Sequence, residues 1–156
     1  MPILYSQQLA GQAARPIIKP TDPAYGSRVY RFRGTINLAA IATGTFGTTQ
    51  VAAATTDWIH CLTVPGGYVP DFGQITSSVS LGTSVVAIGT NAVHASNGQY
   101  RAAATFTAVD TPTVFGLASM EALAAVAADT PVYLTIATAA LPSAGTLVID
   151  VYCSKP

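Results

Sequence analysis

The sequence predicts an all-β fold, an antiparallel two-sheet sandwich of jelly-roll or Greek-key type with an extended N-terminal arm. Three observations predict this class. Short apolar stretches with a period of two recur along the chain, turn residues separate them, and helical periodicity is almost absent. The 156 residues suffice for one domain with a sizeable core. We therefore expect an arm over residues 1–26 and a β-sandwich domain over residues 27–156.

The arm is predicted from Pro2, Pro16, Pro20 and Pro23 and from the lack of an apolar period around them. Each proline fixes its own φ and pushes the preceding residue toward an extended conformation. A free arm would leave its apolar side chains in solvent, so we expect it to dock on a neighbouring protein. Its candidate interface residues are Ile3, Leu4, Tyr5, Arg15, Ile17, Ile18 and Lys19.

The first strand of the sandwich is expected from Arg28 onward, where a period of two sorts the residues onto two faces. The apolar face carries Tyr30, Phe32, Ile36 and Leu38. The other face carries Thr35 and two arginines, Arg31 and Arg33. The sequence therefore predicts a half-buried strand with a basic outer face, and both arginines are candidate interface residues.

The next part of the chain divides into a weakly patterned segment and three strands. Thr43–Thr56 has no strong period and predicts a long loop or a weak edge strand. Strands are expected over Asp57–Val64, Tyr68–Leu81 and Thr83–Ile88. Pro65-Gly66-Gly67 ends the first of them.

Asn97-Gly98 is the strongest hairpin signal in the chain, because a type I′ turn needs a positive φ at both central positions. It predicts a hairpin between Ala92–Ala95 and Gln99–Thr107. In the second of these strands Arg101 is expected on one face. The opposite, apolar face is expected to carry Tyr100, Ala102, Ala104 and Phe106.

Two strands close the chain, joined by a Pro/Gly turn at Leu141–Gly145. The first is expected to bury Val132, Leu134 and Ile136. The second is expected to bury Leu147, Ile149, Val151 and Cys153. Only Ser119–Ala128, an Ala-rich run behind a plausible N-cap, has the composition of a helix.

The charge content is low and unevenly distributed. Only 9% of the residues are charged, where an ordinary soluble domain carries about 25%. Residues 1–56 hold five basic residues and one acid, a net charge of +4, and the remainder holds two basic residues and six acids, a net charge of −4. A surface of Ala, Thr, Gly and Ser on a chain of zero net charge favours contact with other protein, including other copies.

Several classes of protein are disfavoured by what the sequence lacks. The first twenty residues contain no sustained apolar run, and no apolar stretch reaches eighteen residues, so neither a signal peptide nor a membrane span is expected. A pI of about 6.7 argues against a nucleic-acid partner. Without a secretory signal, Cys61 and Cys153 are expected to be reduced. We expect a soluble protein made in a cytoplasm.

No residue pattern supports catalysis, a metal or a cofactor. The two histidines, His60 and His94, accompany no Gly-x-Ser-x-Gly elbow. His60 and Cys61 are neighbours on one strand and point to opposite faces, so they cannot readily join one zinc site. We therefore expect no enzyme. The aromatic residues Trp58, Tyr68, Tyr133 and Tyr152 are candidates for a sugar-stacking platform or, as the low charge favours, for anchors in a subunit interface.

The middle and end of the chain resemble small virion proteins of tailed bacteriophages. The resemblance covers roughly residues 28–153 and includes no catalytic signature. It is carried by Asp71–Ile75, Val79–Gly82, Ser84–Thr90, Gly98–Ala104, Thr111–Phe115, Asp129–Thr135 and Gly145–Val151. It implies a head decoration or cement protein, or a related head or tail component, that assembles as a homo-oligomer.

The function expected from the sequence is therefore structural. We expect a capsid decoration or cement protein of a bacteriophage virion that forms a homo-oligomer, with a trimer as the expected state. Its expected partners are further copies of itself and the major capsid protein or another virion protein. The alternative is a carbohydrate-binding or host-adhesion module on the same sandwich. In the first case aromatic anchors are buried in the assembly, and in the second they stay exposed.

Overall fold

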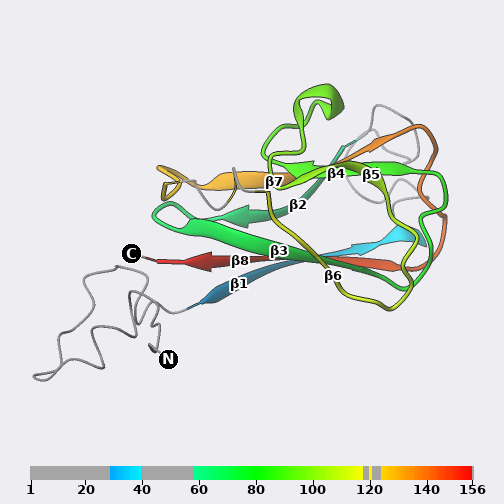
Figure 1. Ribbon diagram of the computed structural model, residues 1–156, viewed down its shortest axis with the longest axis horizontal. Helices are drawn as coiled ribbons and strands as arrows, with labels where there is room; N and C mark the ends of the chain where they lie inside the picture. The colour runs from blue at the N-terminus through cyan, green and yellow to red at the C-terminus, as the bar shows by residue number, and fades with distance from the viewer. Residues whose placement is uncertain (1–28, 40–57, 118–119, 121–123, 156) are drawn as a thin grey trace, which may run out of the picture.

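The computed structural model describes residues 29–39, 58–117, 120 and 124–155 of the chain. These residues form two antiparallel sheets of four strands each, packed face to face, which confirms the predicted two-sheet sandwich. Figure 1 shows the sheets as two layers. No helix among the described residues is long and apolar enough to cross a bilayer.

One sheet has the strand order β1-β8-β3-β6 and the other has the order β2-β7-β4-β5. The strands of the first sheet are β1 (Tyr30–Asn37), β8 (Thr146–Ser154), β3 (Val69–Ser77) and β6 (Thr113–Phe115). The strands of the second sheet are β2 (Trp58–Val64), β7 (Thr130–Ala137), β4 (Val85–Gly89) and β5 (Arg101–Thr105). A short 3-10 turn, η1 (His94–Ser96), lies between β4 and β5.

The strands pair in the manner of a long antiparallel ribbon that has been folded over. β1 pairs with β8, β2 with β7, β3 with β6 and β4 with β5, so the first half of the chain pairs with the second half in reverse order. The pairs β3–β8 and β4–β7 then join the ribbon to itself within each sheet. As a result, β1 and β2 form one edge of the sandwich. The last strands of the two sheets, β6 and β5, lie at the other edge.

The core lies between the sheets and follows the predicted alternation. All four inward residues predicted for the last strand, and all three predicted for β7, are completely buried. Tyr100 and Phe106 are buried as predicted, but Ala102 and Ala104, expected on the same face, are exposed. The pairing of β4 with β5 shifts register between Val86 and Ile88. This irregularity breaks the alternation on which the prediction for β5 relied.

The two-residue hairpin predicted at Asn97-Gly98 is wrong. β5 pairs with β4, and residues 90–100 connect the two strands as a loop that includes η1. The Asn97 side-chain amide donates hydrogen bonds to the carbonyl oxygens of Ala87 and Tyr133, both at 3.2 Å, and to Oγ1 of Thr135 at 3.0 Å. These tertiary hydrogen bonds hold the loop over the outer face of β4 and β7, and a tight turn would forgo them. Gly98 does adopt the predicted positive φ, at 115°.

Several sequence-based predictions lie outside the described residues. These are the arm at residues 1–26, the weakly patterned segment Thr43–Thr56 and part of the possible helix at Ser119–Ala128. Residues 124–128, at the end of that possible helix, have no helical geometry.

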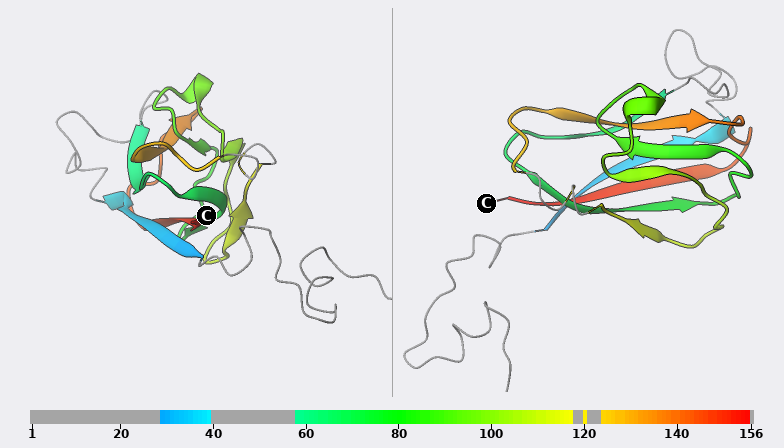
Figure 2. Two further views of the ribbon diagram at one scale, coloured as in Figure 1. Left: turned by 90° about the vertical axis from the view of Figure 1, so that its left-hand side faces the viewer. Right: turned by 45° about the horizontal axis from the view of Figure 1, so that its top comes forward.

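The edge formed by β1 and β2 is closed by a close contact between the two sheets. Gly34 in β1 is buried, and a β-carbon at this position would collide with the carbonyl oxygen of Cys61 in β2. Glycine is therefore required here because the two backbones approach each other too closely for a side chain. Figure 2 (left) shows β1 and β2 together on one side of the sandwich and β6 on the other.

Replacing Gly34 with alanine should destabilise the fold by about 1–3 kcal/mol or more, because the obstructing atom is backbone and cannot rotate away. Urea unfolding curves measure this change. Gly116→Ala is the matched control, since a β-carbon there would meet Phe72 at an ordinary 3.5 Å. Equal stability of the two variants would contradict the close approach of β1 and β2.

The two cysteines are free thiols, as the sequence predicts. Burial raises the pKa of both Cys61 and Cys153 from 9.0 to about 12. At pH 8 the folded thiols should therefore contain about a thousandfold less thiolate than unfolded ones and react correspondingly slowly with iodoacetamide. Because unfolded thiols ionise first, stability should also fall as the pH rises from about 9 toward 12. Native alkylation as fast as in denaturant would contradict their burial.

Candidate interaction surfaces

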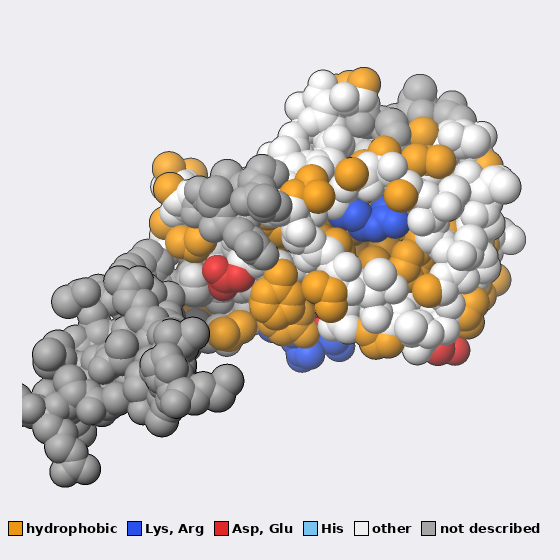
Figure 3. Space-filling view, in the orientation of Figure 1, with side chains coloured by type: hydrophobic (Ala, Val, Ile, Leu, Met, Phe, Trp, Pro, Cys, Tyr) orange, Lys and Arg blue, Asp and Glu red, His pale blue; other side chains and the backbone are white. Residues whose placement is uncertain are grey.

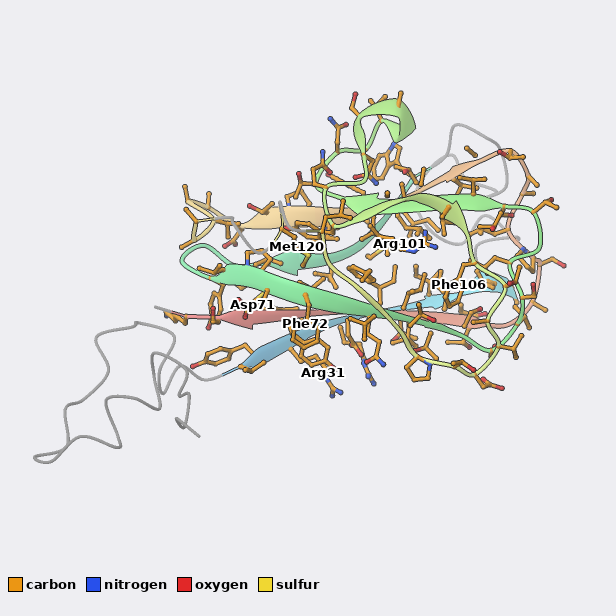
Figure 4. The ribbon with its side chains drawn as sticks, in the orientation of Figure 1. Arg31, Asp71, Phe72, Arg101, Phe106 and Met120 are labelled. Atoms are coloured by element: carbon orange, nitrogen blue, oxygen red, sulfur yellow. The ribbon has the colours of Figure 1, made fainter. Side chains whose placement is uncertain are left out.

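The outer face of the β1-β8-β3-β6 sheet is the first candidate surface, and we call it the Phe72 face. Residues directly opposite each other on neighbouring strands project to the same side of a sheet, so the strand register defines its members. Three rows cross the sheet. They are Arg31, Tyr152 and Phe72; Arg33, Asp150, Gln74 and Val114; and Thr35, Val148 and Thr76. In Figure 3 apolar side chains gather on this part of the molecule above basic ones, and Figure 4 labels Phe72 and Arg31 there.

An aromatic stack forms the most prominent apolar part of this face. The rings of Phe72 and Tyr152 lie almost parallel, at an interplanar angle of 13°, with their centroids 4.6 Å apart. Phe72 is 38% exposed, and Val114 on the adjacent strand β6 is 67% exposed. Large apolar side chains exposed together on one sheet face are typical of a surface that contacts another protein.

Phe72 reaches the outer face because of an irregularity in β3. The pairing of β3 with β8 shifts register between Pro70 and Phe72. Beyond this shift Gly73 and Ile75 are buried, so Phe72 points outward with Gln74. A β-bulge of this kind leaves no reliable mark in a single sequence. Phe72 and Val114 are therefore the surface residues that the sequence analysis missed.

The basic outer face predicted for β1 is present but partly neutralised. Nε and one Nη of Arg33 donate to the two carboxylate oxygens of Asp150, at 2.7 Å and 2.8 Å. The hydrogen bonds and charge of Asp150 raise the pKa of the Arg33 guanidinium. Arg31 has no carboxylate partner among the described residues and is exposed. Arg31 thus supplies the free positive charge beside the aromatic stack.

The second candidate surface is the outer face of β2 and β7. Trp58 is 48% exposed and packs edge-on against Tyr133, with ring centroids 5.1 Å apart. The ring of His60 lies 5.5 Å from that of Tyr133. We call these three residues the Trp58 cluster. It lies on the opposite sheet from the Phe72 face.

The four aromatic residues singled out in the sequence do not form one platform. Trp58 and Tyr133 lie on one sheet, and Tyr152 stacks on Phe72 on the other. Tyr68 packs against Tyr30 and Phe32 beside the core instead. A single sugar-stacking surface built from all four residues is therefore wrong.

The described residues include no candidate metal site. In this part of the chain, no group of three or more His, Cys, Asp or Glu side chains is placed to hold a metal ion. Nε2 of His60 lies 3.0 Å from both the Leu62 carbonyl oxygen and Oγ1 of Thr63. Of the candidate interface residues, Arg31 and Arg33 lie side by side on the Phe72 face. The others, Ile3, Leu4, Tyr5, Arg15, Ile17, Ile18 and Lys19, lie outside the described residues.

Two solved structures contain chains similar to this one. A chain of the cyanophage Pam1 capsid asymmetric unit is 21% identical with a TM-score of 0.55, and the match covers 100% of both chains. A chain of the capsid of Ralstonia phage GP4 is 16% identical with a TM-score of 0.55, over 86% of this chain and 88% of that one. No protein-family model and no curated protein matches the chain. At these identities the similarity shows a shared fold.

The ion pair of Arg33 and Asp150 should matter for stability, although it lies on the outer face. Arg33→Ala would leave the Asp150 carboxylate, whose side chain is only 6% exposed, without its partner. We expect this variant to lower the midpoint of urea unfolding. Arg31→Ala, its neighbour on the same face, should leave the midpoint almost unchanged. Equal midpoints for the two variants would contradict a structural role for the pair.

Proposed function

We propose that the protein is a structural, non-enzymatic component of a bacteriophage virion. Its role is that of a decoration or cement protein that forms a homo-oligomer, with a trimer as the expected state, and binds the major capsid protein or another virion protein. Its place of synthesis is the host cytoplasm. The observation that carries this proposal is the Phe72 face, an exposed apolar and basic surface on a rigid sheet.

The fold supports the proposal. The four-pair antiparallel ribbon, closed by β3–β8 and β4–β7, is the strand pairing expected of a jelly roll, an architecture used in viral capsids. The chains that share this fold at 100% and 86% coverage come from phage capsids. These similarities favour a virion component over other uses of a β-sandwich.

The surface chemistry supports attachment to a protein lattice. Complete burial of a fully exposed apolar side chain contributes about 1.5–3 kcal/mol, so burying the exposed parts of Phe72 and Val114 would contribute only a fraction of that each. The strands beneath them are held on a packed core, so little conformational entropy is lost on binding. Arg31 adds a positive charge at the margin, which favours a partner surface that carries a carboxylate. Repeated over many copies on a lattice, such contacts would hold neighbouring capsid subunits together.

Glycan binding remains the second candidate function. It is supported by Trp58, because a half-exposed tryptophan beside further aromatic rings is a residue type suited to stacking on sugars. The two functions use opposite sheets, so variants on one sheet distinguish them.

Phe72→Ala should weaken binding to capsids assembled without this protein by about 10- to 30-fold, the effect of removing one well-packed interface anchor. Co-sedimentation with such capsids measures it. Trp58→Ala is the matched control, an exposed aromatic residue on the other sheet, and should bind like the wild type. If Phe72→Ala binds normally and Trp58→Ala loses binding, the Trp58 cluster and not the Phe72 face binds the capsid.

A further inference from the structure

The strand β5 is an exposed sheet edge that carries neither lysine nor proline. Ala102, Ala103, Ala104 and Thr105 are all exposed, so both faces of this strand are accessible. β5 is the last strand of its sheet, and its outer side pairs with no other strand among the described residues. An unpaired edge presents backbone N–H and C=O groups that can pair with another chain.

The single charged residue of β5 turns inward and places no charge across the outer side of this edge. The Arg101 guanidinium turns back onto its own sheet and donates to the carbonyl oxygens of Val86, Ala104 and Thr105. It also lies 5.9 Å from the centre of the Phe106 ring. Figure 4 shows the labelled Arg101 between the two sheets, near Phe106. Lysines and prolines protect many edge strands, and β5 has neither, so its protection is limited to the inward Arg101 and the register shift against β4.

The other long edge strands differ from β5. β1 and β2 meet at Gly34 and Cys61, so their edge of the sandwich is closed by the opposite sheet. β6 at the remaining edge is only three residues long. Among the described residues, β5 is thus the edge strand that best suits the addition of a strand.

The N-terminal arm contains a segment suited to pair with β5. Proline cannot donate to a β ladder, so a pairing segment must lie between prolines. Residues 3–15, between Pro2 and Pro16, are the longest proline-free stretch of the arm and exceed the five residues of β5. They begin with Ile3, Leu4 and Tyr5, whose bulky side chains could cover the small alanines of β5.

The geometry of the connection favours a neighbouring copy over the same copy. The arm joins the sandwich at β1, at the other edge of the molecule from β5. Residues 16–28 are the spacer between that segment and the sandwich, and thirteen residues can span at most about 45 Å. To reach β5 of its own chain the spacer would have to bend around the sandwich. A neighbouring copy requires no such bend.

We propose that residues 3–15 of one copy add an antiparallel or parallel strand to the β5 edge of the next copy, linking the sandwiches head to tail. This inference rests on the homo-oligomer of the proposed function and names the contact that forms it. A head-to-tail contact of this kind closes into a ring when its rotation permits.

Light scattering of the full chain with Ala103→Lys tests the edge. A lysine at the centre of β5 should block strand addition, so the mass should fall from that of the oligomer toward the 16.0 kDa of one chain. Ala144→Lys adds the same charge at another exposed alanine and should keep the oligomer. An Ala103→Lys protein with wild-type mass would overturn the inference.

Crosslinking tests whether the N-terminal arm of another copy pairs with the β5 edge. Chains carrying Tyr5→Cys and chains carrying Ala103→Cys are co-expressed and treated with a short bismaleimide, to which the partly buried Cys61 and the buried Cys153 should react slowly because their thiol pKa values are raised to about 12. We expect dimers that link one variant to the other, and far fewer when Ala144→Cys replaces Ala103→Cys. A chain that carries both Tyr5→Cys and Ala103→Cys tests for a contact within one copy. If crosslinks form only within this chain, and not between the singly substituted chains, the exchange between copies is overturned. A monomeric wild type would instead refute the homo-oligomer itself.

Discussion

The structure depends on the placement of β8 between β1 and β3. This nine-residue strand pairs along its length on both sides, and alternate residues from Leu147 to Cys153 are completely buried against the other sheet. The same alternation sends Val148, Asp150 and Tyr152 to the opposite side. The burial of one set of side chains therefore fixes the position of the other. The core and the Phe72 face are two consequences of one strand.

The Phe72 face and the β5 edge differ in how the fold supports them. The Phe72 face crosses all four strands of a sheet, and its ion pair of Arg33 and Asp150 joins the neighbouring strands β1 and β8 through side chains. The β5 edge instead lies where the ladder is irregular and the side chains are small. The first surface is suited to rigid docking on a flat partner. The second is suited to an extended segment that supplies its own backbone hydrogen bonds.

Much of the fold could be predicted from the sequence, because a period of two is a local property. The inward residues of β7 and β8 and the outward arginines of β1 follow from alternation alone. The bulge before Phe72 could not be predicted in this way, since a single extra residue reverses which side chains face outward. The ion-pair partner of Arg33 could not be predicted from local sequence either, because Asp150 lies 117 residues away. At Asn97 a strong local turn signal was overridden by hydrogen bonds to Ala87, Tyr133 and Thr135, the last two of which lie 36 and 38 residues away.

We propose that the Phe72 face contacts another virion protein in the assembled particle. Hydroxyl-radical footprinting of the free protein and of the protein bound to capsids tests it most directly, because the labelling rate of each aromatic side chain reports its own exposure. If the Phe72 face is the capsid contact, Phe72 and Tyr152 are protected on the capsid, while Trp58 and Tyr133 keep the labelling rates of the free protein. Protection of Trp58 and Tyr133, with Phe72 labelled as fast as in the free protein, would contradict it.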